Sequence, residues 1–547
     1  GFCQDLSLKI EGQNKIESSI IDSLGYLKLH TDFKSIQSEV DLINAALFKI
    51  GYIENELKSL KKTNDTAFYS QIHLKNKFNT IYIDYNKNNI DTSILNLVSK
   101  DVFEDYFILK FSEVESALNF INSEISKKGF PFSNLQNPAT EESGIFTKSE
   151  EEIENLANLF DRDKDQNEII KFVPASGAAS RMFKFLFEAS NAETEPNDKD
   201  YKTFFEGIEK FPFFENLSAE LQQLANGKFE EKRKFLKVLL NEEPFAFGKK
   251  PKAMIPFHKT NNLPRLAIEE HFAETEFFGA NDGKLQLHFT ISPEHKTMFE
   301  LESEKLKLKY QSIYPNGIEV TFSEQMESTD MVAVLEDNSP VKTTEGFLFR
   351  PGGHGALIEN LNNLNADLIF IKNIDNVLPP FFHAKNGKYK RFMGGVLLQI
   401  TRELFQLQKN FSEHGYSEKL ADAAQHFAKA ALGISSLNIN SSELLKSFLF
   451  KPVRVCGMVK NEGEPGGGPF WVKQTNGATT LQIVEKSQVD LNNAKQVEIL
   501  NSATHFNPVD IVCGIKNYKG ETYDLKQFID PKTYFITKKS KNIMLSY

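Results

Sequence analysis

The sequence predicts an α/β protein in which a mainly parallel sheet is flanked by helices. Its 547 residues exceed the size of a single hydrophobic core, so two or three domains are expected. Hydrophobic residues make up 40% of the chain and charged residues 25%, which is the balance of a soluble globular protein. From Lys171 onward, short apolar runs alternate with helical patterns, as is typical of parallel strands joined by helices.

Residues 1–137 are expected to form a small N-terminal α/β domain, and residues 138–547 a larger one. The boundary is placed at Asn137–Ser143, which is polar and contains a proline. In the small domain, alternating and amphipathic patterns predict strands over Leu6–Ile10 and Thr80–Tyr85 and helices over Ser35–Ile50 and Glu113–Ile125.

The larger domain should begin with a helix over Glu150–Phe160, opened by the capping box Ser149–Glu152. A helical layer is expected around residues 388–450, from the patterns of Val396–Phe411 and Glu418–Leu432. Apolar runs predict the sheet strands Ile169–Val173, Leu285–Ile291, Ile318–Phe322, Met331–Leu335 and Leu368–Ile371.

The stretch Val173–Lys184 carries the first candidate site. A strand breaks at small residues and then enters a helix, predicted over Arg181–Phe187, so free backbone N–H groups should lie at the positive end of a helix dipole. Arg181 adds a forked donor for phosphate oxygens. The alternative is an ordinary strand-to-helix turn. The candidate phosphate-binding residues are Ala175, Ser176, Gly177, Ala178, Ala179, Ser180 and Arg181.

Two later polar residues are candidates for ligand contact. Lys252 lies in a loop stiffened by Pro251 and Pro256, and a solvated turn is the alternative interpretation. Gln325 follows a predicted strand, where open α/β sheets bind ligands, and its amide can both donate and accept toward a base edge. An exposed loop glutamine is the commoner case.

A second glycine-rich loop precedes a helix predicted over Ala356–Leu364. Glycines add unfolded-state entropy that folding must overcome, so simple packing explains them poorly. A ligand-binding loop is therefore favoured. The candidate nucleotide-binding residues are Gly352, Gly353, His354 and Gly355.

The strand predicted at Leu368–Ile371 is followed by Asp375 and Asn376. A carboxylate at the carboxyl edge of a sheet is a hard oxygen ligand that can hold Mg²⁺ between phosphates. A simple Asp-Asn turn is the alternative. Further along, Arg454–Val459 and Leu481–Glu485 are predicted as strands around the loop 461–469, and Asp510 or His505 could complete a metal or phosphate site.

These elements resemble, in order, those of UDP-sugar pyrophosphorylases and related sugar nucleotidyltransferases. Residues from about 128 to 547 also resemble a bacterial family known as domain of unknown function 4301. The resemblance implies a nucleotide-diphospho-sugar transferase fold of the GT-A-like kind, with UTP as the favoured nucleotide and a sugar 1-phosphate as co-substrate. It implies catalytic roles for Arg181, Lys252 and Asp375, sugar contacts from Asn376 and Glu485, and Mg²⁺ on Asp375 and Asp510.

The sequence departs from the family pattern at three positions. Ser176 and Ala179 stand where glycine is usual, and His354 stands where asparagine is usual. A non-catalytic protein that binds a nucleotide or nucleotide-sugar therefore remains an alternative. A glycosyltransferase of similar fold is another alternative.

Charge and cysteine content bear on partners and compartment. A net charge of −10 argues against a general nucleic-acid binder, and no apolar run reaches the roughly 18 residues needed to span a bilayer. Three distant cysteines suit a reducing cytoplasm. Residues 1–127 resemble the periplasmic repeats of outer-membrane assembly proteins at LSLKIEG, KIGYIEN and KKGFPFS. That resemblance implies a protein partner bound by strand addition, and an envelope partner-binding protein as a further alternative.

Overall fold

The computed structural model describes most of the chain between residues 6 and 529, and the predicted loop residues Ala178, Ser180 and Arg181 lie outside the described part. The side chains of Ser93, Glu327 and His354 are outside it as well. The positions within 6–529 that it leaves out are 59, 86–91, 115, 119, 122–134, 178, 180–181, 262, 336–338, 345, 351, 435–438, 465 and 474–478.

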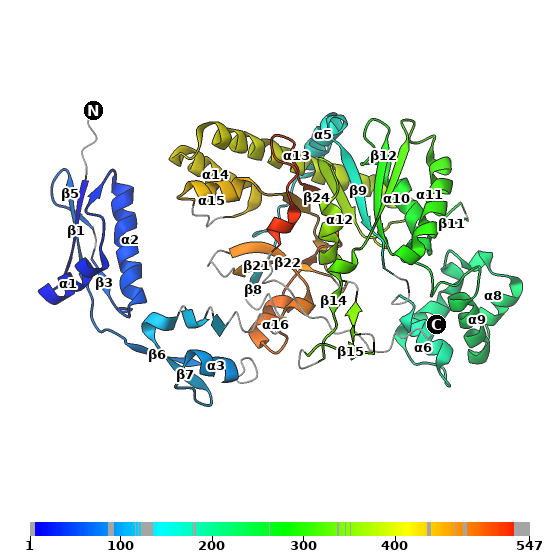
Figure 1. The fold of residues 1–547 in the computed structure, drawn as a ribbon, viewed down its shortest axis with the longest axis horizontal. Helices are drawn as coiled ribbons and strands as arrows, with labels where there is room; N and C mark the ends of the chain where they lie inside the picture. The colour runs from blue at the N-terminus through cyan, green and yellow to red at the C-terminus, as the bar shows by residue number, and fades with distance from the viewer. Residues whose placement is uncertain are drawn as a thin grey trace.

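Two small α/β units come first in the chain (Figure 1). In the first, β1 and β5 are parallel, and the helices bury Ile21, Ile36 and Leu47 against the sheet. The predicted strand at Leu6–Ile10 and helix at Ser35–Ile50 are confirmed. The elements are β1 Leu6–Gly12, α1 Lys15–Leu24, β2 Leu29–His30, α2 Phe33–Lys49, β3 Glu56–Leu57, β4 Lys61–Lys62 and β5 Ala67–His73, followed in the second unit by β6 Thr80–Asp84, α3 Thr92–Val98 and β7 Tyr106–Lys110.

The main body is built on a six-stranded sheet with the order β13-β12-β9-β18-β24-β19. The strands β13, β12, β9 and β18 are mutually parallel, whereas β24 is antiparallel to both of its neighbours. The sheet is therefore mixed, and the prediction of a mainly parallel sheet was only partly right. Its strands are β9 Ile169–Pro174, β12 Leu285–Ile291, β13 Ile318–Glu324, β18 Leu368–Lys372, β19 Val453–Cys456 and β24 Asp510–Gly514.

Helices cover both faces of this sheet because side chains alternate along each strand. One face packs against α5, α10, α11 and α13, and the other packs against α12. Helices α5 and α13 approach so closely that a Cβ added at Gly395 would lie 1.9 Å from the carbonyl oxygen of Leu156. The helices are α5 Glu150–Asp163, α10 Ala267–Thr275, α11 Lys296–Tyr310, α12 Ile358–Asn362, α13 His383–His414, α14 Glu418–Leu432, α15 Ser442–Leu449 and α16 Ala494–Asn501.

The predicted capping box at the start of α5 is confirmed, since Ser149 and Glu152 bond reciprocally to each other's backbone N–H. The helix predicted at Glu418–Leu432 has the bounds of α14, and the one predicted at Val396–Phe411 lies inside α13. The chain division predicted at residue 137 stays a prediction. It falls within β8, Leu135–Pro138, which pairs with β21 of the main body.

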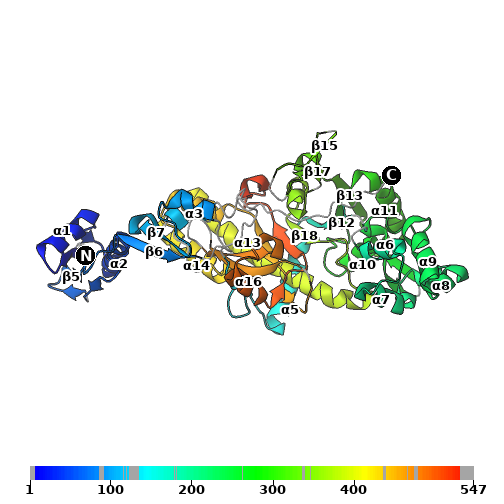
Figure 2. The ribbon, with the colours of Figure 1, turned by 90° about the horizontal axis from the view of Figure 1, so that it is seen from below.

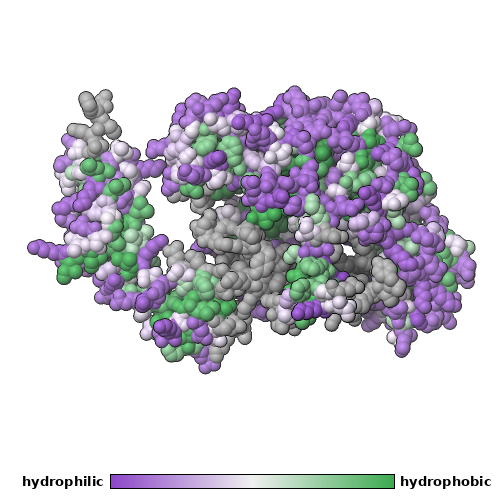
Figure 3. Space-filling model, in the orientation of Figure 1, coloured by the Kyte–Doolittle hydropathy of each residue, from purple (hydrophilic) through white to green (hydrophobic). Residues whose placement is uncertain are grey.

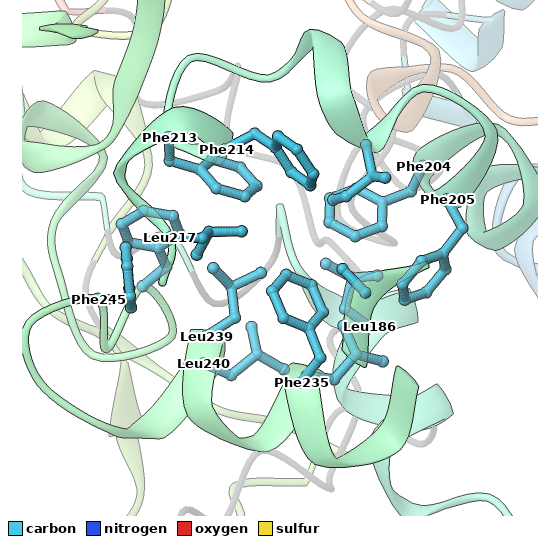
Figure 4. Packing of buried hydrophobic residues seen from close by; sticks show 14 of the residues in the cluster. Leu186, Phe204, Phe205, Phe213, Phe214, Leu217, Phe235, Leu239, Leu240 and Phe245 are labelled. Carbon is cyan, nitrogen blue, oxygen red and sulfur yellow. The ribbon is translucent and has the colours of Figure 1, made fainter. Parts of the chain in front are cut away.

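A helical segment is inserted between β9 and the predicted lysine loop. It comprises α6 Lys184–Asn191, α7 Lys199–Glu206, α8 Ala219–Ala225 and α9 Phe229–Asn241. Its core is unusually rich in phenylalanine, and Figure 4 shows rings from different helices and loops pointing toward one another. The ring centroids of Phe213 and Phe247 lie 5.4 Å apart. Some of the 48 phenylalanines in the chain therefore pack in this core.

Three predicted elements differ from those observed. The strand predicted at Met331–Leu335 is only β14, Met331–Val332, and it pairs with β17, Phe349–Arg350, outside the main sheet. The helix predicted from Arg181 begins at Lys184. The strands predicted at Arg454–Val459 and Leu481–Glu485 do not pair with each other, because β22 Thr479–Val484 pairs with β21 Gly468–Lys473, while β19 joins the main sheet. The remaining short strands are β10 Pro256–Thr260, β11 Leu263–Leu266, β15 Lys342–Thr343, β16 Gly346–Phe347, β20 Val459–Lys460 and β23 His505–Phe506.

The surface is largely hydrophilic, with hydrophobic residues gathered over the β6–β7–α3 unit and around β14 (Figure 3). Figure 2 shows the hairpins of β15 and β17 standing out from the main body. Met331, Phe347 and Phe349 are each about half exposed there, at 55%, 51% and 55%. Among the residues that the structure describes, none of the helices has the length and apolarity needed to cross a membrane.

Candidate functional site

The candidate site lies at the carboxyl edge of the main sheet. Because β9, β12 and β18 are parallel, the segments that follow them meet at the same edge. Ala175 N–H donates to Thr290 O at 2.9 Å, and Ile374 N–H donates to Pro174 O at 3.2 Å. The Ser292 hydroxyl donates to Ser176 O at 2.9 Å. These bonds fix the start of the small-residue loop against the ends of both neighbouring strands.

The helical insertion returns the chain to the same loop. Lys252 N–H donates to Gly177 O, and Ala179 N–H donates to Lys250 O, both at 3.3 Å. Ala179 is fully buried in the core of the insertion, so the loop is fixed at both ends. The folded insertion thus places the predicted lysine element beside the predicted phosphate loop.

Lys252 and Asp375 form an ion pair between Lys252 Nζ and Asp375 Oδ2. They are 123 residues apart in the chain. Their side chains are 23% and 33% exposed, so solvent reaches both groups. The structure therefore brings together two of the three residues predicted to be catalytic. Arg181, the third, lies outside the described residues.

In the described part of the loop after β9, some of the backbone N–H groups are already bonded and others are available to a ligand. The N–H groups of Ala175 and Ala179 already donate to protein carbonyls. Those of Ser176 and Gly177 donate to no residue that the structure describes. A Cβ added at Gly177 would meet no atom within 4 Å, so there is open space beside this part of the loop. Among the described residues of this loop, Ser176 and Gly177 are the backbone donors left for a ligand.

Gln325 and the glycine-rich loop lie side by side. The Gln325 amide Nε2 donates to Gly352 O at 3.2 Å. A Cβ added at Gly352 would lie 2.8 Å from Thr329 O, so this glycine is required for packing. At Gly353 and Gly355 an added Cβ would meet nothing within 4 Å. The side chain of His354 lies outside the described residues.

The end of β13 that presents Gln325 is held by a polar network. Asn360 of α12 donates from Nδ2 to Ser323 Oγ at 2.8 Å and to Glu324 O at 2.9 Å. The Ser323 hydroxyl lies 2.8 Å from Nε2 of the buried His288. Burial lowers the pKa of His288 to about 4, so its ring is neutral at pH 7.

The remaining predicted residues lie on the β18 and β22 sides. Asn376 Nδ2 donates to Pro508 O at 2.7 Å, and Asp510 is paired with Lys372 in the sheet register. The carboxylate of Asp510 is bound by the buried ammonium of Lys390. Glu485 follows β22, and its backbone N–H donates to Gln488 Oε1 at 2.8 Å. No described contact joins Glu485 to Asp375.

Buried lysines under this edge were missed by sequence reasoning. Lys171 of β9 and Lys372 of β18 each donate to Glu274 of α10, at 2.6 Å, and all three side chains are at most 3% exposed. Lys171 also donates to Thr275 Oγ1 at 3.1 Å. The available signal was a lysine inside an apolar strand, since a buried charge requires a buried partner.

The pKa values of these groups shift because of burial and because of the charges of their neighbours. Burial lowers the pKa of Lys171 to about 8, although Glu274 opposes this. Burial would raise the pKa of Glu274, but Lys171 and Lys372 hold it well below its usual range. Burial, together with the charge of Lys372, holds the pKa of Lys390 well below its usual range, even though Asp510 binds its ammonium. Three buried lysines therefore share two acidic partners beneath the site.

Asp375 is the better candidate of the two predicted Mg²⁺ ligands. It is partly exposed and paired with a partly exposed lysine, which solvent and ligand can displace. Asp510 is held by a buried lysine. No group of three or more His, Cys, Asp or Glu suited to a metal occurs among the described residues. Mg²⁺ is usually held by one or two carboxylates together with substrate phosphates, so the donor set at Asp375 fits such a site.

Solved structures with partial similarity include three from trypanosomatids. A uridine diphosphate N-acetylglucosamine pyrophosphorylase from Trypanosoma brucei in complex with inhibitor is 11% identical, with a TM-score of 0.35, and the match covers 74% of this chain and 58% of that one. A UDP-glucose phosphorylase from T. brucei is 10% identical, with a TM-score of 0.30 and coverage of 74% and 59%. A mutant UDP-glucose pyrophosphorylase from Leishmania major in complex with UDP-glucose is 10% identical, with a TM-score of 0.28 and coverage of 73% and 60%. The matches span less than two thirds of each of those chains.

A search of curated proteins finds no match. Nothing in the comparisons supports the resemblance of residues 1–127 to periplasmic repeats. The sequence does match one family over residues 109–544, which is most of its length and includes every described residue of the candidate site. The chain therefore belongs to the family described as Domain of unknown function (DUF4301).

Proposed function

We propose that the protein is a sugar-phosphate nucleotidyltransferase that favours UTP and acts on a sugar 1-phosphate. The observation that carries the proposal is the Lys252–Asp375 ion pair beside the Ser176–Gly177 loop at the carboxyl edge of the sheet. An ammonium for phosphate, a carboxylate for a hard cation and free backbone N–H groups are what a metal–triphosphate requires. The order of the sequence elements supports the same assignment.

In the proposed reaction, an oxygen of the sugar phosphate attacks the α-phosphorus of the nucleotide. A new P–O bond forms, the bond from the α-phosphorus to the bridging oxygen breaks, and its electron pair leaves with pyrophosphate. Lys252 would leave Asp375 to bind phosphate oxygens, and Ser176 and Gly177 would donate from the backbone, with Arg181 assigned from the sequence. This is catalysis by positioning and charge stabilisation.

Asp375 would hold Mg²⁺, which when bound supplies positive charge between the phosphates. Asn376 and Glu485 remain proposed sugar contacts, and Asp510 remains a proposed second metal ligand. The net charge of −10 means that anionic substrates depend on local positive groups, and Lys252 would provide one. The cytoplasm is the proposed compartment, because three distant cysteines suit a reducing environment.

The proposal is tested by measuring pyrophosphate release from UTP with Mg²⁺ and a panel of hexose and N-acetylhexosamine 1-phosphates. Turnover with at least one sugar phosphate is expected, and it should depend on both the sugar phosphate and the metal. MgUTP that stabilises the protein without any turnover would indicate a nucleotide-binding protein. No binding of MgUTP and no turnover would refute the proposal.

Gln325→Ala is expected to remove a preference for UTP over ATP. The donation from Nε2 to Gly352 O leaves the Gln325 carbonyl to accept the N3–H of uracil. A buried polar group left without its partner costs about 1–3 kcal/mol, which corresponds to a preference of roughly tenfold or more. Competition between UTP and ATP, measured on wild type and Gln325→Ala, tests this. The exposed Gln311 at the end of α11 provides a control substitution to alanine. Wild-type protein that binds ATP as well as UTP would remove the uridine assignment.

A further inference from the structure

Helix α10, Ala267–Thr275, is buried along its whole length although it carries three glutamates and a histidine. Such groups are stable in a core only when each one has partners. The three glutamates find their partners on different elements. Glu274 binds the lysines of the sheet, and Glu269 binds Lys309 and Tyr310 of α11, at 2.7 and 3.0 Å. The partners of Glu270 lie toward the candidate site.

Glu270 is fully buried and receives donors from three elements. His258 Nδ1 lies 3.0 Å from Oε1, Arg265 Nη1 lies 3.2 Å from Oε2, and His383 Nε2 lies 3.3 Å from Oε2. Burial would raise the pKa of this carboxyl, but the hydrogen bonds from His258 and His383 and the charge of Arg265 lower the pKa to about 2. The group is therefore an ionised carboxylate at pH 7, which only accepts hydrogen bonds.

Each histidine belongs to one of the two chain segments that form the site. His258 lies on β10, in the segment that begins with Lys252. His383 begins α13, at the end of the segment that carries Asp375, and its Nε2–H is shared with Leu378 O at 2.9 Å. Glu270 is thus bonded to the lysine segment on one side and to the aspartate segment on the other.

Two more bonds from α10 reinforce this link. Ala267 N–H donates to Ile255 O at 3.1 Å, three residues after Lys252. The His271 ring donates from Nε2 to Ile374 O at 3.2 Å, next to Asp375. Burial, together with the charge of Lys171, holds the pKa of His271 well below its usual range, so this ring is a neutral donor. The helix therefore contacts both segments at two points each.

We propose that Glu270 is a positioning residue, which holds the Lys252 segment and the Asp375 segment at the separation that forms their ion pair. This deepens the proposed function, because the same separation would set the spacing of the phosphate-binding and metal-binding groups. The ion pair joins two residues of the chain itself, so the inference is testable independently of turnover.

Glu270→Gln provides a sharp test because the amide keeps the size of the side chain and has only one acceptor oxygen. In one orientation its NH₂ group would face the donor of His258, and in the other it would face those of Arg265 and His383. In either case at least one segment is released. Glu269→Gln is the matched control. Glu269 is the neighbouring residue on the same helix, is 6% exposed and also pairs with Arg265, but its other partners lie on α11.

The measurement is acetylation of the full-length protein by a limiting amount of acetic anhydride, read for the Lys252 peptide by mass spectrometry. Labelling of Lys284, whose ion pair with Glu319 at 2.8 Å lies at the opposite ends of the strands, is the internal reference. In Asp375→Asn, Lys252 loses its partner, so the labelling measured in this variant defines the level of an unpaired Lys252. All variants are compared well below the lowest of their Tm values.

Glu270→Gln is expected to raise Lys252 labelling about two- to fivefold, toward the level of Asp375→Asn, as fits the loss of a partly exposed ion pair. Glu269→Gln should leave Lys252 labelling unchanged, although it should lower Tm about as much as Glu270→Gln does. Equal labelling in the two glutamine variants, or no increase in Glu270→Gln or Asp375→Asn, would overturn the inference. MgUTP binding by the same variants reports separately on the proposed function.

Discussion

Glu274→Gln is expected to lower the free energy of unfolding by about 3–5 kcal/mol, because it leaves buried ammonium groups without their counter-charge. Lys171 and Lys372 both donate to this carboxylate, and the side chains of all three are almost completely buried. Urea unfolding followed by circular dichroism measures the change. Glu300→Gln, on the exposed side of α11, is the control, and it should change stability by less than about 0.5 kcal/mol.

The sign of the pH dependence gives a second check on Glu274. Its pKa in the folded state lies below the usual value of 4.5, so its contribution is present above about pH 4.5 and is lost as the pH falls. The difference between wild type and Glu274→Gln should therefore shrink in acid. A loss of less than about 1 kcal/mol at pH 7 would mean that the lysines find other partners or release their protons.

Local sequence patterns predicted most of the elements that position the site. The apolar runs at Ile169–Val173, Leu285–Ile291 and Leu368–Ile371 became β9, β12 and β18, whose carboxyl ends form the site edge. The capping box at Ser149 was predictable because it depends only on residues three positions apart. Periodicity and caps are local properties, and the sequence displays them directly.

Strand direction and pairing could not be predicted in the same way. The antiparallel placement of β24 between β18 and β19 depends on chain segments far apart in sequence. The pattern at Met331–Leu335 looks like a strand of the main sheet, but only Met331 and Val332 form a strand, which pairs with β17, and Val334 bridges to Pro340. A run of β-branched and apolar residues indicates an extended conformation without showing which neighbour it meets.

The sequence predicted the separate elements of the site, but it did not predict how they lie relative to one another. Lys252 and Asp375 were each singled out by motif, and their ion pair is a property of the folded chain. The roles of Glu270 and Glu274 were not predicted, because the sequence shows acidic residues on a helix without showing that the helix is buried. Lysines within the apolar runs of β9 and β18 were the signal that buried acids must lie nearby.

Asp375→Asn is expected to weaken binding of MgUTP by about 2–4 kcal/mol, or roughly thirtyfold to a thousandfold, while leaving the fold intact. An amide is neutral and a poor ligand for Mg²⁺, so the metal-dependent part of the affinity should be lost. Stability should change little, because Lys252 and Asp375 are partly exposed and such ion pairs contribute at most about 1 kcal/mol. Calorimetric titration with UTP, in the presence and absence of Mg²⁺, measures both parts.

Asp367→Asn is the matched control for Asp375→Asn. Asp367 immediately precedes β18 and Asp375 follows it, so the two carboxylates lie at opposite ends of one strand. Asp367 accepts from Glu168 N–H at 2.8 Å and pairs with Lys516 at 2.9 Å, away from the candidate site. Asp367→Asn should therefore affect stability and leave the metal dependence of UTP binding unchanged. If Asp375→Asn retained the wild-type dependence on Mg²⁺, or if both variants lost it equally, Asp375 would not be the residue that holds the metal.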